Sequence, residues 1–65
     1  MQVELNGEVV ETQASTLSDL IIEREVAAAT VATAVNGEFV ARTARDSTRL
    51  TKGMRIEILS PMQGG

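Results

Sequence analysis

Apolar and polar residues alternate at the start of the chain, which is the pattern of a strand with one buried face. Within residues 1–5, the odd positions are apolar and the even positions are polar or charged. Asn6-Gly7 follows, and both residue types tolerate the positive φ of a tight hairpin turn. Residues 8–12 are rich in β-branched side chains, which favour a strand. We therefore predict an opening β-hairpin.

Apolar residues take a helical spacing after residue 15. Residues 16–19 match a pattern typical of a helix start, in which a residue with a hydroxyl group is followed, after two other residues, by an acidic residue. In that form the hydroxyl accepts hydrogen bonds from first-turn amides, and the acid complements the helix dipole. Leu17, Leu20 and Ile21 recur at three- and four-residue intervals. A helix is therefore predicted from about residue 17 to residue 25.

A second hairpin is predicted after the helix. Residues 27–29 are all alanine and either extend the helix or form a compact connection. Residues 31–35 carry small and β-branched side chains on both faces, which is typical of a central strand. Asn36-Gly37 is the second hairpin turn, and residues 38–41 form the returning strand.

The last third of the chain predicts one more strand. Residues 42–48 are polar without periodicity, which predicts a loop with a short 3₁₀ turn. Leu50 is the lone apolar residue there and is expected to fill the core. A turn around Gly53 leads to a strand over residues 55–59, whose two isoleucines share one face. Pro61 ends that strand because proline has no N–H to donate.

This order of elements predicts an α+β fold. One helix must cover one face of a mixed sheet of about four to five strands, because neither buries its apolar side alone. The first and last strands would lie side by side in the middle, with the two hairpins outward. This is the β-grasp, or ubiquitin-like, arrangement. We assign the domain to residues 1–61 and treat residues 62–65 as a flexible C-terminal tail.

Composition narrows the function. The chain has 65 residues, no Cys and no His, so it offers no thiol nucleophile, disulfide, cysteine-based zinc site or histidine base. No catalytic or metal-binding residue is assigned, and an enzyme is the last of the hypotheses. The longest apolar runs are three or four residues. We therefore expect neither a membrane span nor a signal peptide, and a cytoplasmic protein without a membrane partner.

Charge and aromatic content argue against a nucleic-acid partner. The net charge is −3 and Phe39 is the only aromatic residue, whereas nucleic-acid sites combine basicity with stacking side chains. The bases after residue 41 are interpreted as solvated surface: Arg42, Arg45, Arg49, Lys52 and Arg55. The scattered acids Asp19, Glu23 and Glu25 are interpreted as a solvated helix face. Phe39 is predicted to lie in the core rather than in an apolar docking patch, and residues 30–32 are also predicted core.

The C-terminus carries the most distinctive chemistry. Gly64-Gly65 has no side chains, so an extended backbone there can pass through a narrow channel. A free carboxylate at its end can be activated as a mixed anhydride with AMP, and the carbonyl carbon is then open to attack. The alternative is that the glycines are incidental, as in many flexible tails.

Several segments resemble the ThiS family, the bacterial ubiquitin-like sulfur carriers of thiamine biosynthesis. The resemblance is carried by residues 35–40, VNGEFV, and by residues 50–65, LTKGMRIEILSPMQGG. Residues 1–7 are also similar, so the resemblance spans essentially the whole chain. The chain departs from the family at Ala41, where many members have Pro, and at Met54, where Asp is common. Both departures lie in turns away from the tail.

The resemblance implies that Gly65 is the modified residue. A ThiF-like adenylyltransferase would use ATP and Mg²⁺ to adenylate its carboxylate. Sulfur from a cysteine desulfurase would convert it to a thiocarboxylate, and thiazole synthase would accept that sulfur. The tail residues Met62, Gln63, Gly64 and Gly65 would thread into the partners' active sites. The carrier itself would bind no cofactor and would be a monomer when free.

Other functions fit the same tail. A MoaD-like carrier for molybdopterin synthesis shares the fold and the first chemical step. A ubiquitin-like modifier would join the carboxylate to lysines of other proteins, and a passive scaffold domain would leave the glycines without a role. Exposed edge strands leave self-association open.

Overall fold

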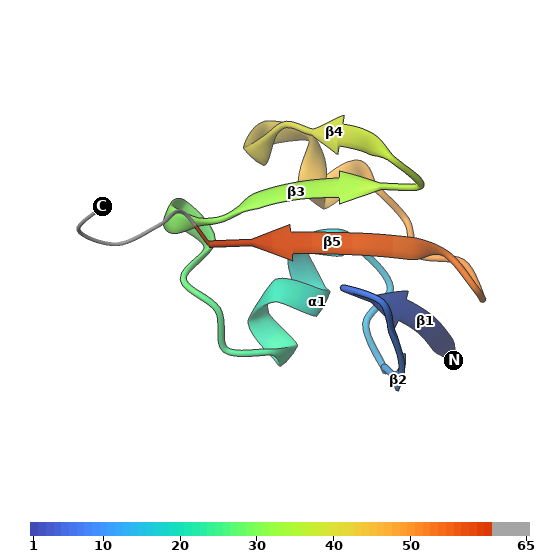
Figure 1. The fold of residues 1–65 in the computed structure, drawn as a ribbon. Helices are drawn as coiled ribbons and strands as arrows, with labels where there is room; N and C mark the ends of the chain where they lie inside the picture. The colour runs from blue at the N-terminus through green and yellow to red at the C-terminus, as the bar shows by residue number, and fades with distance from the viewer. Residues whose placement is uncertain (61–65) are drawn as a thin grey trace.

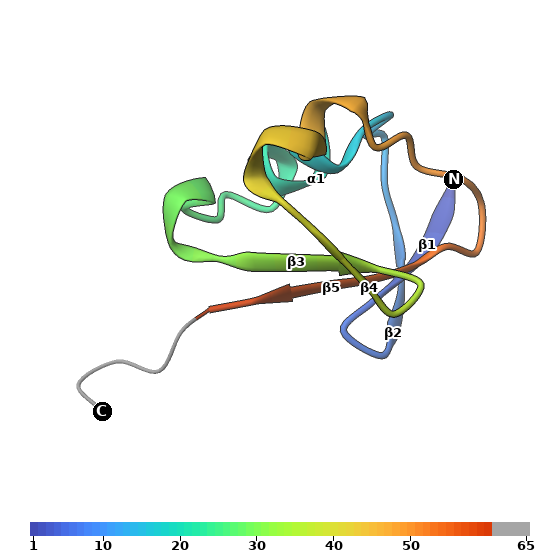
Figure 2. The same cartoon turned by 90° about the horizontal axis from the view of Figure 1, so that it is seen from above.

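A five-stranded sheet carries all the helical segments on one face (Figures 1 and 2). The computed structural model describes residues 1–60. The strands are β1 (Gln2–Leu5), β2 (Glu8–Glu11), β3 (Ala32–Val35), β4 (Glu38–Val40) and β5 (Arg55–Leu59). The helical segments are α1 (Leu17–Glu23) and two 3₁₀ segments, η1 (Ala28–Thr30) and η2 (Arg42–Ser47). The predicted fold, a mixed sheet covered by one main helix, is confirmed.

The strand order is β2-β1-β5-β3-β4. β1 pairs in parallel with β5, whereas β3 pairs with β5 in the antiparallel sense. Each hairpin therefore lies outward of the central strand, β1 with β2 on one side and β3 with β4 on the other. The predicted adjacency of the first and last strands is confirmed, and with it the β-grasp order.

Both hairpin turns use an Asn-Gly pair in the left-handed region, as predicted. Asn6 and Gly7 have φ values of 50° and 87°, and Asn36 and Gly37 have values of 51° and 85°. Paired positive φ values match the right-handed twist of the strands that the turn joins. Asparagine and glycine are the residues that tolerate this conformation best.

Helix α1 begins where the sequence predicts and ends two residues early. The Thr16 hydroxyl accepts a hydrogen bond from the Asp19 amide at 3.1 Å, which is the predicted N-cap. Arg24 caps the other end, and Glu25 leaves the helix with φ 57°. The alanines after it do not extend α1, because they enter the separate 3₁₀ segment η1. No helix in residues 1–60 is long and apolar enough to cross a membrane.

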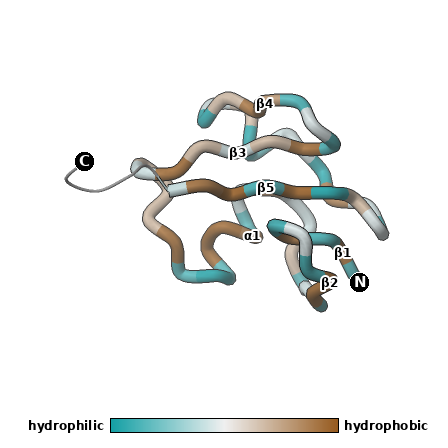
Figure 3. Tube along the Cα trace, viewed as in Figure 1, coloured by the Kyte–Doolittle hydropathy of each residue, from teal (hydrophilic) through white to brown (hydrophobic). Residues whose placement is uncertain are grey.

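The core lies between α1 and the inner face of the sheet. Hydrophobic positions gather on α1 and along β5 (Figure 3). Leu50 is buried as predicted. Of residues 30–32 only Val31 is buried, so the prediction of core there is wrong for its two neighbours. Successive side chains point to opposite sides of an extended chain, which allows only one of the two faces to meet the helix. The buried apolar residues are Val3, Ala14, Leu17, Leu20, Ile21, Val31, Leu50, Ile56 and Ile58.

The prediction that Phe39 lies in the core is wrong, since its side chain is 74% exposed. Phe39 pairs with Ala34 across the hairpin, while the next pair joins Thr33 to Val40. Thr33 is buried beneath the helical layer, so the alternation of side chains places Phe39 on the outer face. The face of β4 on which Phe39 lies therefore decides the exposure of its side chain, even though that side chain is apolar.

The prediction of a solvated surface for the five bases is wrong at Arg45, whose side chain is only 4% exposed. Its guanidinium is held by three neutral oxygens, those of Ala28, Val31 and Thr33. Segment η2 directs the Arg45 side chain inward against β3. The polar residues around Arg45 in the sequence do not predict this burial. The other four bases are exposed, as predicted.

The exposed carboxylate of Glu23 accepts hydrogen bonds from the segment that connects β2 to α1. The Thr12 hydroxyl and the Gln13 amide both donate hydrogen bonds to it. These two bonds, that of Thr12 first, hold the pKa of Glu23 below its usual value of 4.5. Asp19 and Glu25 are exposed as well, so the predicted solvation of the three acids is confirmed, although Glu25 lies beyond the end of α1 and not on the helix.

We predict that the Glu23 carboxylate contributes stability at neutral pH that is lost in acid. A lowered folded-state pKa means that this contribution is complete above the unfolded value, near 4.5, and disappears as the pH falls through the folded value. Glu23→Gln should therefore melt below the wild type at pH 7, and the gap should close as the pH drops below 4.5. Thermal melts followed by circular dichroism across this range test the prediction.

Glu25→Gln is the matched control, because Glu25 makes no side-chain hydrogen bond within residues 1–60. Its melting temperature should follow the wild type at each pH. Identical pH profiles for the two variants would contradict the assignment of this stability to Glu23.

Candidate functional site

The predicted site residues lie beyond the central strand. Met62, Gln63, Gly64 and Gly65 fall outside the described residues, as does the predicted domain boundary at residue 61. The threading of these residues and the modification of Gly65 stay predictions. Residues 1–60 do describe the platform that leads to them, which is strand β5 and its surroundings.

One side of β5 is held by a side chain from the first hairpin turn. The Asn6 amide oxygen accepts from the Ile58 amide at 3.0 Å, and its amide nitrogen donates to the Ile58 carbonyl at 3.1 Å. The Asn6 backbone amide also donates to the Ile56 carbonyl at 2.9 Å. Asparagine carries one donor and one acceptor side by side, so it can pair with a strand as a backbone would. It extends the β1–β5 pairing toward the end of β5.

The other side of β5 is held at its opposite end by the second turn. The Asn36 amide donates to the Arg55 carbonyl at 2.7 Å, and its side-chain oxygen accepts from the Arg55 amide at 3.0 Å. Ala32 pairs with Leu59 at the far end of the same edge. Sequence reasoning identified both asparagines as turn residues only. Their second role needs the strand register, which the sequence pattern does not contain.

Apolar side chains lie on the outer face of the sheet, from β4 across β3 to the end of β5. We define the outer patch as Ala32, Ala34, Phe39 and Leu59, which lie on three neighbouring strands. Ala32 pairs with Leu59 and Ala34 pairs with Phe39. Leu59 is 56% exposed and Phe39 is 74% exposed. Exposed apolar groups concentrated at one place are typical of an interaction surface.

Residues 1–60 provide a fixed strand that leads toward the C-terminal residues in the sequence and an exposed apolar surface for a partner. No group of three or more acidic side chains in this part of the chain could hold a metal ion. Strand β5 is bonded on both edges, precedes the tail in the sequence, and ends at Leu59 of the outer patch. The arrangement can fix the direction of the chain and offer a surface to a partner.

Comparisons with known proteins agree with this geometry. The model of the ThiS family matches residues 1–65. The crystal structure of the thiamine biosynthesis protein ThiS from Geobacter metallireducens is 32% identical, with a TM-score of 0.84 and coverage of 100% of both chains. The NMR solution structure of a thiamine biosynthesis protein from the same organism is 30% identical, with a TM-score of 0.83. That similarity covers 100% of this chain and 88% of the other. No curated protein matches the chain.

We predict that Asn6→Ala destabilises the fold more than Asn36→Ala does. The two residues have nearly the same φ, 50° and 51°, so the conformational cost of alanine is matched. Asn6 makes two side-chain bonds to β5 and Asn36 makes one. The difference in unfolding free energy should be about 1 kcal/mol. Urea denaturation of both variants measures it.

Amide hydrogen exchange locates the effect. The Ile58 amide should exchange faster in Asn6→Ala, because its acceptor is the removed oxygen. In Asn36→Ala the affected amide should be that of Arg55. Unchanged protection of the Ile58 amide in Asn6→Ala would contradict the role of the Asn6 side chain in holding β5.

Proposed function

Because the chain belongs to the ThiS family, we propose that it is a sulfur carrier of thiamine biosynthesis and acts as a protein substrate rather than as an enzyme. The family match over residues 1–65 carries this proposal. Gly64-Gly65 follows the central strand in the sequence, which supplies the feature that such a carrier needs. The similarity to a ThiS protein over 100% of both chains supports it further.

The proposed chemistry takes place at the carboxylate of Gly65. A ThiF-like adenylyltransferase, with ATP and Mg²⁺, joins this carboxylate to AMP and releases pyrophosphate. The terminal sulfur of a persulfide supplied by a cysteine desulfurase then attacks the carbonyl carbon, displaces AMP and forms an acyl disulfide. A thiol reductant cleaves the S–S bond, becomes oxidised to a disulfide and leaves the thiocarboxylate on Gly65. Thiazole synthase accepts the sulfur. The chain contains no cysteine, so the terminal carboxyl is the group on which it can carry sulfur.

The proposed role of the tail follows from its lack of bulk. Gly64 and Gly65 allow the backbone to extend through a narrow entrance to an active site. Met62 and Gln63 precede them and are proposed to contact the walls of that entrance. The bonds that fix β5 would hold the root of the tail in one direction and lower the conformational entropy lost when a partner binds.

The outer patch is the proposed docking surface for these partners. An exposed aromatic side chain such as Phe39 buries a large apolar area when a partner covers it. Leu59 is the last residue of β5, so a partner bound to the patch lies next to the root of the tail. Docking there and threading of the tail can therefore occur together.

We predict that the carrier gains the mass of one sulfur atom in place of one oxygen. The reaction contains the full chain, a ThiF-like adenylyltransferase, ATP, Mg²⁺, a cysteine desulfurase with cysteine, and a thiol reductant. Intact mass spectrometry measures the gain. Deletion of Gly65 should abolish it and leave the circular dichroism spectrum unchanged, because the five strands described within residues 1–60 do not include this residue.

The absence of any mass change in the full reaction would count against the proposed function. Where the mass gain is observed, addition of thiazole synthase and its substrates should return the mass of the carrier to its starting value. A thiocarboxylate that thiazole synthase leaves untouched, but that molybdopterin synthase consumes, would assign the carrier to the other pathway.

We predict that Phe39→Ala lowers the kcat/KM of adenylation about tenfold, the effect of losing an aromatic contact at an interface. Val9→Ala is the matched control, since Val9 is an apolar residue 69% exposed on β2, away from the outer patch. Pyrophosphate release measures the rates. Both variants should melt near the wild type, because neither side chain lies in the core. Equal effects of the two substitutions would rule out the outer patch as the docking surface.

A further inference from the structure

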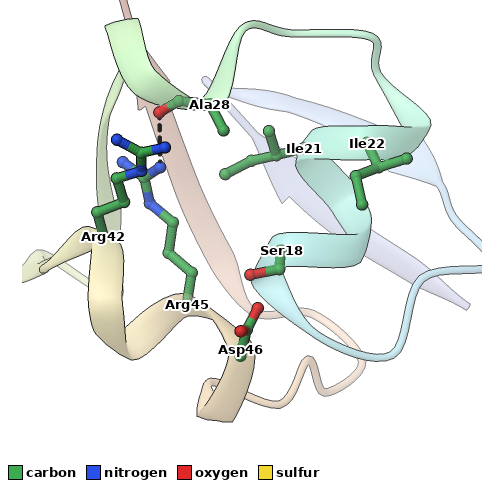
Figure 4. Close-up of a pocket in the computed structure, with 7 residues that line it drawn as sticks. All are labelled: Ser18, Ile21, Ile22, Ala28, Arg42, Arg45 and Asp46. Atoms are coloured by element: carbon green, nitrogen blue, oxygen red, sulfur yellow. Dashed lines mark hydrogen bonds between the residues drawn. The ribbon is translucent and has the colours of Figure 1, made fainter.

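A cavity of about 280 Å³ lies on the helical side of the sheet, between α1, η1 and η2 (Figure 4). Ile21 and Ile22 form an apolar wall from α1, and Ser18 adds a hydroxyl from the same helix. Arg42 and Arg45 enter from η2, together with Asp46. The outer patch faces the other side of the sheet, so the proposed carrier function makes no use of this cavity.

Arg45 brings a positive charge into the protein without an acidic partner. Its Nε donates to the Thr33 hydroxyl at 3.0 Å, and its Nη1 and Nη2 donate to the carbonyls of Ala28 and Val31 at 2.9 and 2.7 Å. All three acceptors are neutral. A guanidinium has five N–H donors, so these bonds leave two of them. A buried charge without an opposite charge is costly, and an anion in the cavity would neutralise it.

A second cation, that of Arg42, points to the same end of the cavity. Residues three apart eclipse one another on a 3₁₀ helix, which places both arginines on one side of η2. Figure 4 shows their guanidinium groups near Ala28, with Asp46 at the other end beside Ser18. The one ion pair within residues 1–60 joins the Met1 amino group to Glu11. Neither guanidinium therefore forms an ion pair with a carboxylate of residues 1–60.

We propose that this cavity binds a small organic oxyanion. Two guanidinium groups at one end suit a phosphate monoester or a carboxylate, which arginine holds through paired N–H bonds. The isoleucines suit an apolar body next to the anionic group, and the volume admits a ligand of a few carbon atoms. Ser18 and Asp46 can accept a hydrogen bond from a hydroxyl or amino group at the ligand's far end.

Titration of the full chain, labelled with ¹⁵N, tests the proposal at constant ionic strength. The probes are phenyl phosphate, benzoate and inorganic phosphate. The first two share an apolar ring and differ in the anion, whereas the third lacks the ring. We expect at least one ring-bearing anion to shift the amides of Ala28, Arg42 and Arg45 saturably, and to bind tighter than inorganic phosphate. The tighter of the two organic probes identifies the oxyanion.

Arg42→Gln is the test variant, because its exposed side chain makes no hydrogen bond within residues 1–60 and the fold should survive. It should raise the Kd about tenfold, the loss of one charge-assisted contact. Arg49→Gln is the control, since Arg49 is exposed outside the cavity and the charge change is the same. Its Kd should equal that of the wild type.

Three results would overturn the proposal. They are no saturable shift with either ring-bearing anion, a Kd that Arg42→Gln leaves unchanged, and equal weakening by Arg42→Gln and Arg49→Gln. The last would show general screening of charge. The assay contains no partner enzyme and no sulfur donor, so its outcome is independent of the carrier reaction.

Discussion

The pairing of β5 with both β1 and β3 is the interaction on which the rest of the fold depends. Each hairpin is local in sequence, but neither has a face large enough to be stable alone. β5 joins them, in parallel with β1 and in the antiparallel sense with β3. Its two isoleucines complete the floor on which α1 packs. The last strand within residues 1–60 is thus the one that closes the sheet, and the five-stranded sheet is complete only when residues 55–59 are available.

The same constraint explains which features could be predicted from the sequence. The hairpins, the N-cap at Thr16 and the inward face of β5 rest on neighbours within a few residues, and all are confirmed. The failures concern side chains whose surroundings come from distant segments. The face of Phe39 is decided by the register of an edge strand, and the burial of Arg45 by carbonyls from another segment. Neither composition nor periodicity contains that information.

The candidate site shows the same division. The Gly64-Gly65 pair is visible in the sequence because its chemistry lies in the backbone and needs no neighbours. The outer patch was missed as a unit, since its members come from three strands and are brought together by the pairings of Ala32 with Leu59 and of Ala34 with Phe39. The hydrogen bonds from the Asn6 side chain to Ile58 were missed for a similar reason, because the two residues are fifty-two positions apart in the sequence.

The two surfaces on opposite faces of the sheet meet at one short segment. The Val31 carbonyl accepts from Arg45 on the cavity side, and the next residue, Ala32, pairs with Leu59 at the root of the tail. A ligand can couple the two surfaces only if it binds two arrangements of this segment with different affinity. An anion that leaves the bond between Arg45 and Val31 intact would therefore occupy the cavity without changing β5. One that draws the guanidinium away from Val31 would remove a hydrogen bond at the residue directly before Ala32, the partner of Leu59.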